Sequence, residues 1–274
     1  MWHEPARVDI LNRRVVTYLL CIGLASFAAT ARAADDTQGG QLPVVAATAG
    51  PSTPTDFLIG APRAWISFRG SQLFPRAGGE LFRFVSDQLT VDRRSFRARG
   101  LVGDLGVVLG SRLDLVVGFD RTQRATPSEY RHYVASNGQP IAQRTELKQM
   151  ALSIGTRYSP LGRGLNISRF AFIPRRFTPY VGGGAAMAFY NFEQQGQFVD
   201  ANDLSIFNDH FASDGWSVGP YVNGGVDVQV WRRLSVSFDG RYSWLHSDLD
   251  SDFSGFNGID LAGFRASSGI SVVF

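Results

Sequence analysis

The histidine and serine side chains of this sequence are poorly placed for nucleophilic chemistry. A histidine can take the proton of a serine hydroxyl only where both side chains lie on the same side of an element. On a strand this requires an even separation, because successive side chains alternate between the two faces. His246 and Ser243 are three residues apart, and none of His132, His210 and His246 has a serine two positions away. We therefore expect no catalytic residues and no enzymatic activity.

An acidic run near the C-terminus is a candidate cation site. Asp248, Asp250 and Asp252 alternate along it, and clustered carboxylates suit calcium. An EF-hand loop needs glycine at its sixth position and glutamate at its twelfth, but Phe253 and Ile259 stand there. A single cysteine excludes a Cys-based zinc site and a disulfide framework. We expect a solvated acidic loop, no metal and no cofactor.

The composition excludes several classes of protein. With 44% hydrophobic and 19% charged residues in 274, the chain has enough apolar surface to fold. It lacks the several runs of about 20 apolar residues that a helical membrane protein needs. The formal net charge is only +3, and Lys148 is the one lysine. Nucleic-acid binders carry clustered basic residues and a strong positive charge, so we expect no nucleic-acid partner.

The first 33 residues resemble a leader for export. Residues 15–25 form a short apolar run, and three arginines precede it, Arg7, Arg13 and Arg14. Cleavage is expected between Ala33 and Ala34, after small residues at the two positions that signal peptidase reads. Residues 34–62 are rich in alanine, threonine, proline and glycine without a period, which predicts a flexible periplasmic linker.

Residues 63–274 have the pattern of a barrel. Their apolar residues recur with period two, the pattern of strands with two different faces. Tight turns at Gly110-Ser111 and Trp231-Arg232 alternate with long connections, and only 159–177 departs from this alternation. The pattern predicts an all-β fold, an eight-stranded antiparallel up-and-down transmembrane β-barrel. The expected strands are 63–74, 97–109, 112–122, 145–158, 178–192, 215–230, 233–246 and 259–274.

One face of these strands is apolar and the other is polar. A membrane barrel turns its apolar face outward to lipid, so the polar face is expected inside. Eight strands leave room only for side chains, which favours a closed network of paired charges over a water-filled pore. Asp239 is expected to pair with Arg241 or with Arg265 of the neighbouring strand. The expected interior charges are Arg69, Asp104, Asp114, Arg157, Asp227, Asp239, Arg241 and Arg265.

Aromatic residues lie at the ends of the expected strands. Trp216 and Trp244 fall at one level, and Trp231 and Phe274 at the opposite level. Two aromatic girdles are typical of the two membrane–water interfaces. A soluble sandwich with one solvated face is the alternative, and both the leader and the girdles disfavour it.

Two segments resemble a known superfamily. Ile270, Val272 and Phe274 form a C-terminal amphipathic strand that resembles the assembly signal of Gram-negative outer-membrane proteins. Thr178-Pro179-Tyr180-Val181-Gly182-Gly183-Gly184-Ala185 resembles the Pro-Tyr-x-Gly-x-Gly strand of opacity proteins and the OmpA transmembrane domain. The resemblance covers about residues 63–274. It implies the cell outer membrane, its lipid bilayer and lipopolysaccharide, the barrel-assembly machinery and periplasmic chaperones.

The superfamily includes adhesins, structural anchors, small channels and a lipid-editing enzyme. A channel similar to OmpW would need an apolar lumen, whereas this inner face is polar. The superfamily's lipid A deacylases place histidine and serine two residues apart on one strand face, which is absent here. The resemblance therefore implies a structural or surface-interaction role, in which the loops contact host surface ligands. A narrow channel and, less favoured, a lipid A-modifying enzyme remain alternatives.

Two expected loops differ in charge. The 75–99 loop holds six arginines against three acids, and the 193–214 loop holds five acids and neither arginine nor lysine. The arginines could bind the phosphates of lipopolysaccharide in a bidentate manner or pair with the acidic loop. The sequence leaves both open.

Overall fold

The computed structural model describes residues 58–274 except 136, 169–170, 201–202, 250 and 254. The expected leader, the Ala33/Ala34 cleavage site and linker residues 34–57 lie outside the described residues. No helix in the described part is both long and apolar enough to cross a membrane.

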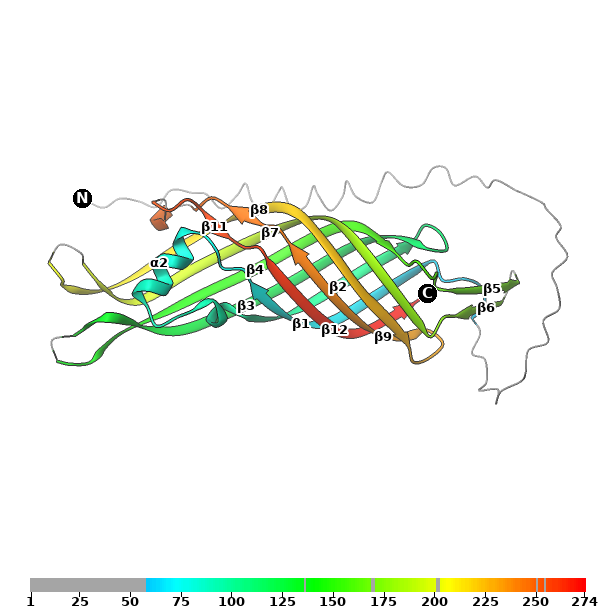
Figure 1. Ribbon diagram of the computed structural model, residues 1–274, viewed down its shortest axis with the longest axis horizontal. Helices are drawn as coiled ribbons and strands as arrows, with labels where there is room; N and C mark the ends of the chain where they lie inside the picture. The colour runs from blue at the N-terminus through cyan, green and yellow to red at the C-terminus, as the bar shows by residue number, and fades with distance from the viewer. Residues whose placement is uncertain (1–57, 136, 169–170, 201–202, 250, 254) are drawn as a thin grey trace, which may run out of the picture. The chain divides into compact units, whose positions relative to one another are not determined.

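Eight antiparallel strands form a closed barrel, which confirms the predicted fold class (Figure 1). Each strand pairs with its neighbour along the chain, and the last strand pairs with the first to close the ring. The eight strands are β1 (Ala64–Pro75), β2 (Ala98–Val108), β3 (Leu113–Val134), β4 (Pro140–Tyr158), β7 (Phe177–Val199), β8 (Ile206–Gln229), β9 (Leu234–Ser243) and β12 (Gly263–Val273).

The period-two pattern has the orientation of a membrane barrel. On β8, Val218 is 69% exposed while the adjacent Ser217 is 1% exposed. On β2, Leu101 is 71% exposed while Val102 and Asp104 face inward and are buried. Apolar side chains therefore cover the outside, where water would be an unfavourable neighbour and lipid a favourable one.

The two ends of the barrel differ in their connections. We call the end with the β2–β3 and β8–β9 turns, the 159–176 connection and Phe274 the turn end. The opposite end, which carries α2 (Glu80–Gln88), η1 (Arg93–Phe96) and η2 (Ser251–Phe253), is the loop end. Two short strands, β10 (His246–Ser247) and β11 (Ile259–Asp260), pair with each other there. Figure 1 shows α2 at the end of the barrel opposite the hairpin of β5 (Gly164–Ser168) and β6 (Ala171–Pro174).

Two of the expected long loops are mostly strand. Residues 123–134 continue β3, 140–144 begin β4, 193–199 continue β7 and 206–214 begin β8. The hairpins β3–β4 and β7–β8 thus extend well beyond the barrel. The period-two apolar signal ends earlier because strands outside a lipid layer have no reason to carry an apolar outer face.

The other two departures are a helix and a small sheet. The expected 75–99 loop contains α2 and η1, both of which bury apolar side chains. The 159–177 connection contains β5 (Gly164–Ser168) and β6 (Ala171–Pro174), which pair as a hairpin at the turn end. Leu58, near the end of the expected linker, forms a bridge with Phe172 of β6.

Candidate functional site

An apolar belt surrounds the barrel, and its boundary toward the loop end is sharp. Met150, Phe189 and Trp216 are neighbours on β4, β7 and β8, and all face outward. Two residues closer to the loop end on each strand, the same face carries Lys148, Asn191 and Asp214. The outer surface therefore changes from apolar to charged within a single row, which is how a membrane–water interface divides a barrel surface.

The predicted girdle tryptophans lie on the outer surface. Trp216 and Trp244 are about half exposed near the loop-end boundary, and Trp231 is 68% exposed in the β8–β9 turn. Phe189 packs against Trp216, and Tyr242 against Trp244.

The turn-side half of the interior is charged. Asp114 is fully buried, accepts a hydrogen bond from the indole Nε1 of Trp65 at 3.2 Å, and forms an ion pair with Arg163. Arg157 pairs with Asp227, lies 3.9 Å from Asp114 and stacks over the Trp65 ring. A Cβ on the adjacent residue of β2 would overlap the indole, so only glycine, Gly106, fits.

A second group of charges lies next to the first. Asp104 pairs with Arg69 and with the Nη2 of Arg241 at 3.5 Å. Asp239 accepts hydrogen bonds from the Tyr180 hydroxyl and the Asn223 amide, both at 2.9 Å, and lies 3.7 Å from Arg69. These groups come from β1, β2, β7, β8 and β9, so the network crosses the lumen and joins opposite walls.

The structure corrects the expected partner of Asp239. Arg241 and Arg265 stand directly opposite each other on β9 and β12, but Arg241 reaches Asp104 and Arg265 pairs with Asp120 at 2.7 Å. Adjacency along the hairpin does not select the partner, because long inward side chains in a narrow barrel meet across the lumen.

All eight expected interior charges lie inside the barrel and take part in ion pairs, and two more join them. Asp120 has the same strand parity as Asp114, so alternation along β3 could have identified it. Arg163 enters from the 159–176 connection, where no period exists to find it. Burial lowers the pKa of Arg163 to about 10, while the charge of Asp227 opposes that change. Arg163 therefore stays cationic at neutral pH.

The charged network borders two small cavities among the described residues. Each is about 10 Å³, which is about the size that one water molecule requires. One lies among Arg69, Asp104 and Tyr180, and the other between Asp120 and Arg265. Several buried polar atoms there, among them Asp120 Oδ1 and Arg265 Nε, have no protein partner, so single waters would satisfy them. Ion pairs between described side chains thus cross the lumen in this half of the interior.

The loop-side half of the interior combines an apolar cluster with uncharged polar side chains such as Thr145 and Gln149. It is covered by what we call the cap: α2, η1 and the described residues of 245–262, which include η2. Phe82 of α2 packs edge-on against Phe96 of η1 and Phe192 of β7. Phe253 of η2 contacts Phe192 as well. The buried cluster is Ala77, Leu81, Phe82, Val85, Leu89, Val91, Phe96, Leu147, Ala151, Ala186, Ala188, Tyr190, Phe192, Tyr221, Leu245, Leu249, Phe253, Ile259 and Leu261.

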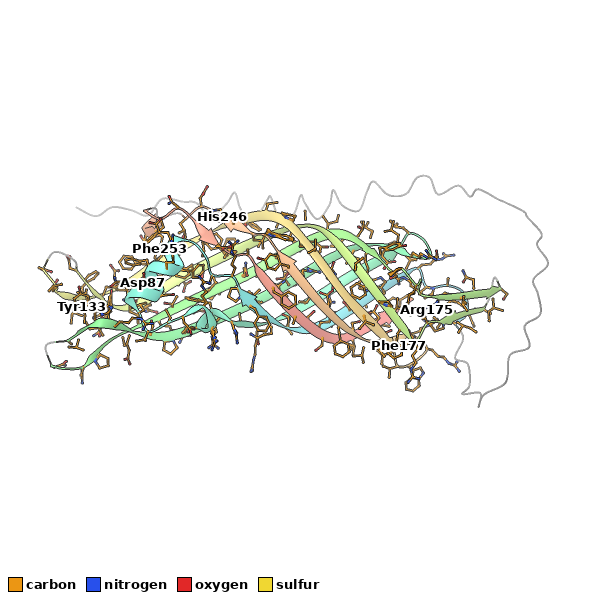
Figure 2. All side chains as sticks on the ribbon, in the orientation of Figure 1. Asp87, Tyr133, Arg175, Phe177, His246 and Phe253 are labelled. Carbon is orange, nitrogen blue, oxygen red and sulfur yellow. The ribbon has the colours of Figure 1, made fainter. Side chains whose placement is uncertain are left out.

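The histidines and the expected acidic run of Asp248 and Asp252 lie outside this interior, and Asp250 of that run lies outside the described residues. Figure 2 shows His246, Phe253 and Asp87 together toward the loop end. His246 and His210 are exposed, and His210 lies 3.9 Å from Glu193. Asp248 and Asp252 are exposed. Among the described residues, no group of three histidine, cysteine or acidic side chains is placed to hold a metal ion.

No protein-family model and no curated protein matches the chain significantly. Solved structures do resemble it. The outer membrane protein OprG of Pseudomonas aeruginosa is 11% identical with a TM-score of 0.45, and the alignment covers 80% of this chain and 98% of OprG. Neisserial surface protein A is 14% identical with a TM-score of 0.40, covering 77% and 97%. Ail of Yersinia pestis is 12% identical with a TM-score of 0.39, covering 79% and 100%. At these identities and TM-scores the likeness gives no evidence about an activity.

Proposed function

We propose that this protein is an integral, non-catalytic barrel of the Gram-negative outer membrane that presents a surface for interaction. The observation that supports the proposal is an apolar outer surface around an interior crossed by buried ion pairs in one half and covered by the cap in the other. Such an interior suits an anchor and disfavours transport, because a solute would have to break buried ion pairs in one half and displace the cap in the other.

The surface offered for interaction is the loop end. Barrels of this membrane have short turns toward the periplasm and longer connections toward the outside, so the turn end is periplasmic in the proposal. The hairpins β3–β4 and β7–β8 then project from the cell. Their outer faces carry mixed charges, with Lys148 within 3.6 Å of both Glu146 and Glu193. Mixed charges on a rigid hairpin suit recognition of a polar surface, such as a host surface ligand.

The proposed partners follow from this placement. Arg99 and Arg121 are exposed just beyond the belt at the loop end, where guanidinium groups can bind lipopolysaccharide phosphates. β12, with outward-facing Ile270 and exposed Phe274, closes the barrel against β1. We propose β12 as the strand that the barrel-assembly machinery recognises after delivery by periplasmic chaperones.

Two measurements test the proposal. Folded into lipid vesicles, the protein should migrate differently on detergent gels before and after boiling, and it should produce no conductance steps in planar bilayers. On intact cells, protease should cut the hairpin tips, residues 135–139 and 200–205, and leave the barrel intact. Solubility without detergent would overturn the membrane assignment. A reproducible conductance would favour the narrow channel, and a lipid A mass change on overexpression would favour the enzyme.

A further inference from the structure

Four arginines occupy equivalent positions at the turn end. Each of the four strands that run from the turn end to the loop end, β1, β3, β7 and β9, begins directly after an arginine. These are Arg63, Arg112, Arg176 and Arg233, and we call them the arginine ring. In the barrel order one strand of opposite direction separates each of these strands from the next. The ring therefore spaces one arginine at every second strand around the circumference.

The same backbone hydrogen bond recurs at all four residues. The carbonyl of each arginine accepts a hydrogen bond from the end of the neighbouring strand, at 2.7–2.9 Å in all four cases. The donors are the amides of Val108 for Arg63, Ser159 for Arg112, Gln229 for Arg176 and Val273 for Arg233. The register shifts from one ring member to the next, since Val108 pairs with Asp114 and Gln229 with Ser235. Such a stagger accompanies strand tilt in a closed barrel, so all four side chains start at the same end of the barrel.

The ring lies where the apolar belt ends. Leu113 and Phe177 follow two of its members directly and are exposed, and Trp231 precedes Arg233 by two positions. The guanidinium group of Arg176 lies 6.0 Å from the centre of the Phe177 ring. Figure 2 shows Arg175 and Phe177, the neighbours of Arg176, at the end of the barrel opposite Phe253. An arginine at such a boundary extends its charged head to the headgroup level while its stem remains on apolar surface.

Among the described residues, the ring has no acidic partner. All four arginines are exposed, and no Asp or Glu of the described residues forms an ion pair with any of them. The segments that make up the turn end, 58–63, 108–113, 159–176 and 230–233, contain neither aspartate nor glutamate. The loop end differs, since Glu80, Asp87 and Asp92 accompany the arginines of residues 76–97.

We propose that the arginine ring binds the phosphates of anionic phospholipid headgroups in the bilayer leaflet that surrounds the turn end. The guanidinium group matches phosphate in a bidentate geometry, and a cationic surface attracts an anionic leaflet. The inference rests on the proposed membrane placement. To that placement it adds the class of lipid that is bound, the leaflet in which the lipid lies and the four arginines that bind it.

The test compares two variants that each lose four positive charges. R63Q/R112Q/R176Q/R233Q removes the ring. R83Q/R93Q/R94Q/R97Q removes four exposed arginines at the loop end and is the matched control. Both are made in a W216F/W244F background, so that Trp231, beside Arg233, is the exposed tryptophan of the barrel; Trp65 is 4% exposed and faces inward.

The measurement is quenching of Trp231 by brominated lipid. The protein is folded into phosphatidylcholine vesicles that contain either brominated phosphatidylglycerol or brominated phosphatidylcholine. The parent and the control variant should show a preference for phosphatidylglycerol of roughly fivefold. The ring variant should show none, and 1 M salt should abolish the preference of the parent, because the Debye length then falls to about 3 Å.

The outcomes separate this inference from the proposed function. A protein that is not heat-modifiable in these vesicles fails the membrane assignment itself. A folded, heat-modifiable protein whose parent lacks the preference, or whose ring variant keeps it, overturns only the lipid inference. Loss of the preference with inorganic phosphate at matched ionic strength would assign the ring to a free anion. Ring-dependent sedimentation with cell-wall sacculi, without a lipid preference, would assign it to the wall polymer.

Discussion

The two halves of the barrel interior are filled in opposite ways by the same strands. On β4 the inward residues near the turn end include Arg157 and Ser153, whereas nearer the loop end they include Ala151 and Leu147. Facing walls supply both members of almost every ion pair in the charged half, so that half is completed by the strands themselves. The apolar half would meet water at the mouth, and a separate segment, the cap, must cover it. The barrel strands themselves therefore close the charged half, whereas the other half is closed only when the cap docks on it.

Breaking the charged half should have the largest effect. Asp104→Ala removes the carboxylate shared by Arg69 and Arg241, and leaves buried guanidinium charge uncompensated. We expect a loss of about 3–5 kcal/mol in the free energy of unfolding, measured by urea unfolding in vesicles. Ser268→Ala, on the exposed outer face of β12, is the control. A loss under about 1 kcal/mol would mean that water fills this half and screens the arginines.

Breaking the apolar half should cost less and stay local. Phe82→Ala removes a ring that is 2% exposed and packed between Phe96 and Phe192. We expect the free energy of cap docking to become less favourable by about 3 kcal/mol, with little change in the stability of the barrel itself. Hydrogen exchange over residues 80–96 should rise while the urea midpoint of the barrel changes little. Phe84→Ala, at a half-exposed position of the same helix, is the matched control. An equal loss of global stability would show that cap and barrel unfold as one unit.

The smallest effect should come from the start of η1. Asp92 accepts hydrogen bonds from the amides of Ser95 and Arg94, and the bond from Ser95 is the main reason that its pKa lies below 3.8. A lowered carboxyl pKa gives stability that is complete above the unfolded value and lost as pH falls through the folded one. The protection factor of the Ser95 amide, which corrects for the intrinsic pH dependence of exchange, should therefore fall below pH 3.8. Asp92→Ala should lower that protection factor at every pH, whereas Asp87→Ala should leave it unchanged.

Strand alternation predicted the barrel well and its contents partly. Period two located all eight strands, because lipid outside and charge inside impose opposite demands on successive residues, as Val218 and Ser217 show. The pattern did not predict the parts of β3 and β7 that extend beyond the belt, because strands outside the lipid layer need no apolar outer face. It also placed the inward charges but not their partners. Asp239 meets Arg69 across the lumen, and that proximity depends on strand tilt and side-chain reach rather than on sequence distance.

The cap was hidden from sequence reasoning for a different reason. Six arginines in residues 75–99 suggested a basic loop that binds phosphate or an acidic loop. The structure places Leu81, Phe82 and Val85 of the same segment on the buried face of a helix of nine residues. A helix that short gives little periodic signal, and the charges on its exposed side dominate the composition. Arg76 does pair with an acid, but with Asp260 of the cap rather than with the 193–214 segment.

The uneven rim of the barrel has a practical consequence. β3, β4, β7 and β8 remain paired far beyond the belt, up to Gln143–Gly196 and Val199–Ile206, while β1, β2, β9 and β12 stop near it. At about 3.4 Å per residue, β7 from Asn191 to Val199 extends roughly 27 Å along its own length. The ladder is complete before each hairpin tip, so foreign residues inserted there lengthen a loop and disturb no strand. Doubling such a loop costs only about 0.6 kcal/mol, which makes these tips natural sites for displaying a foreign epitope on the surface of a cell.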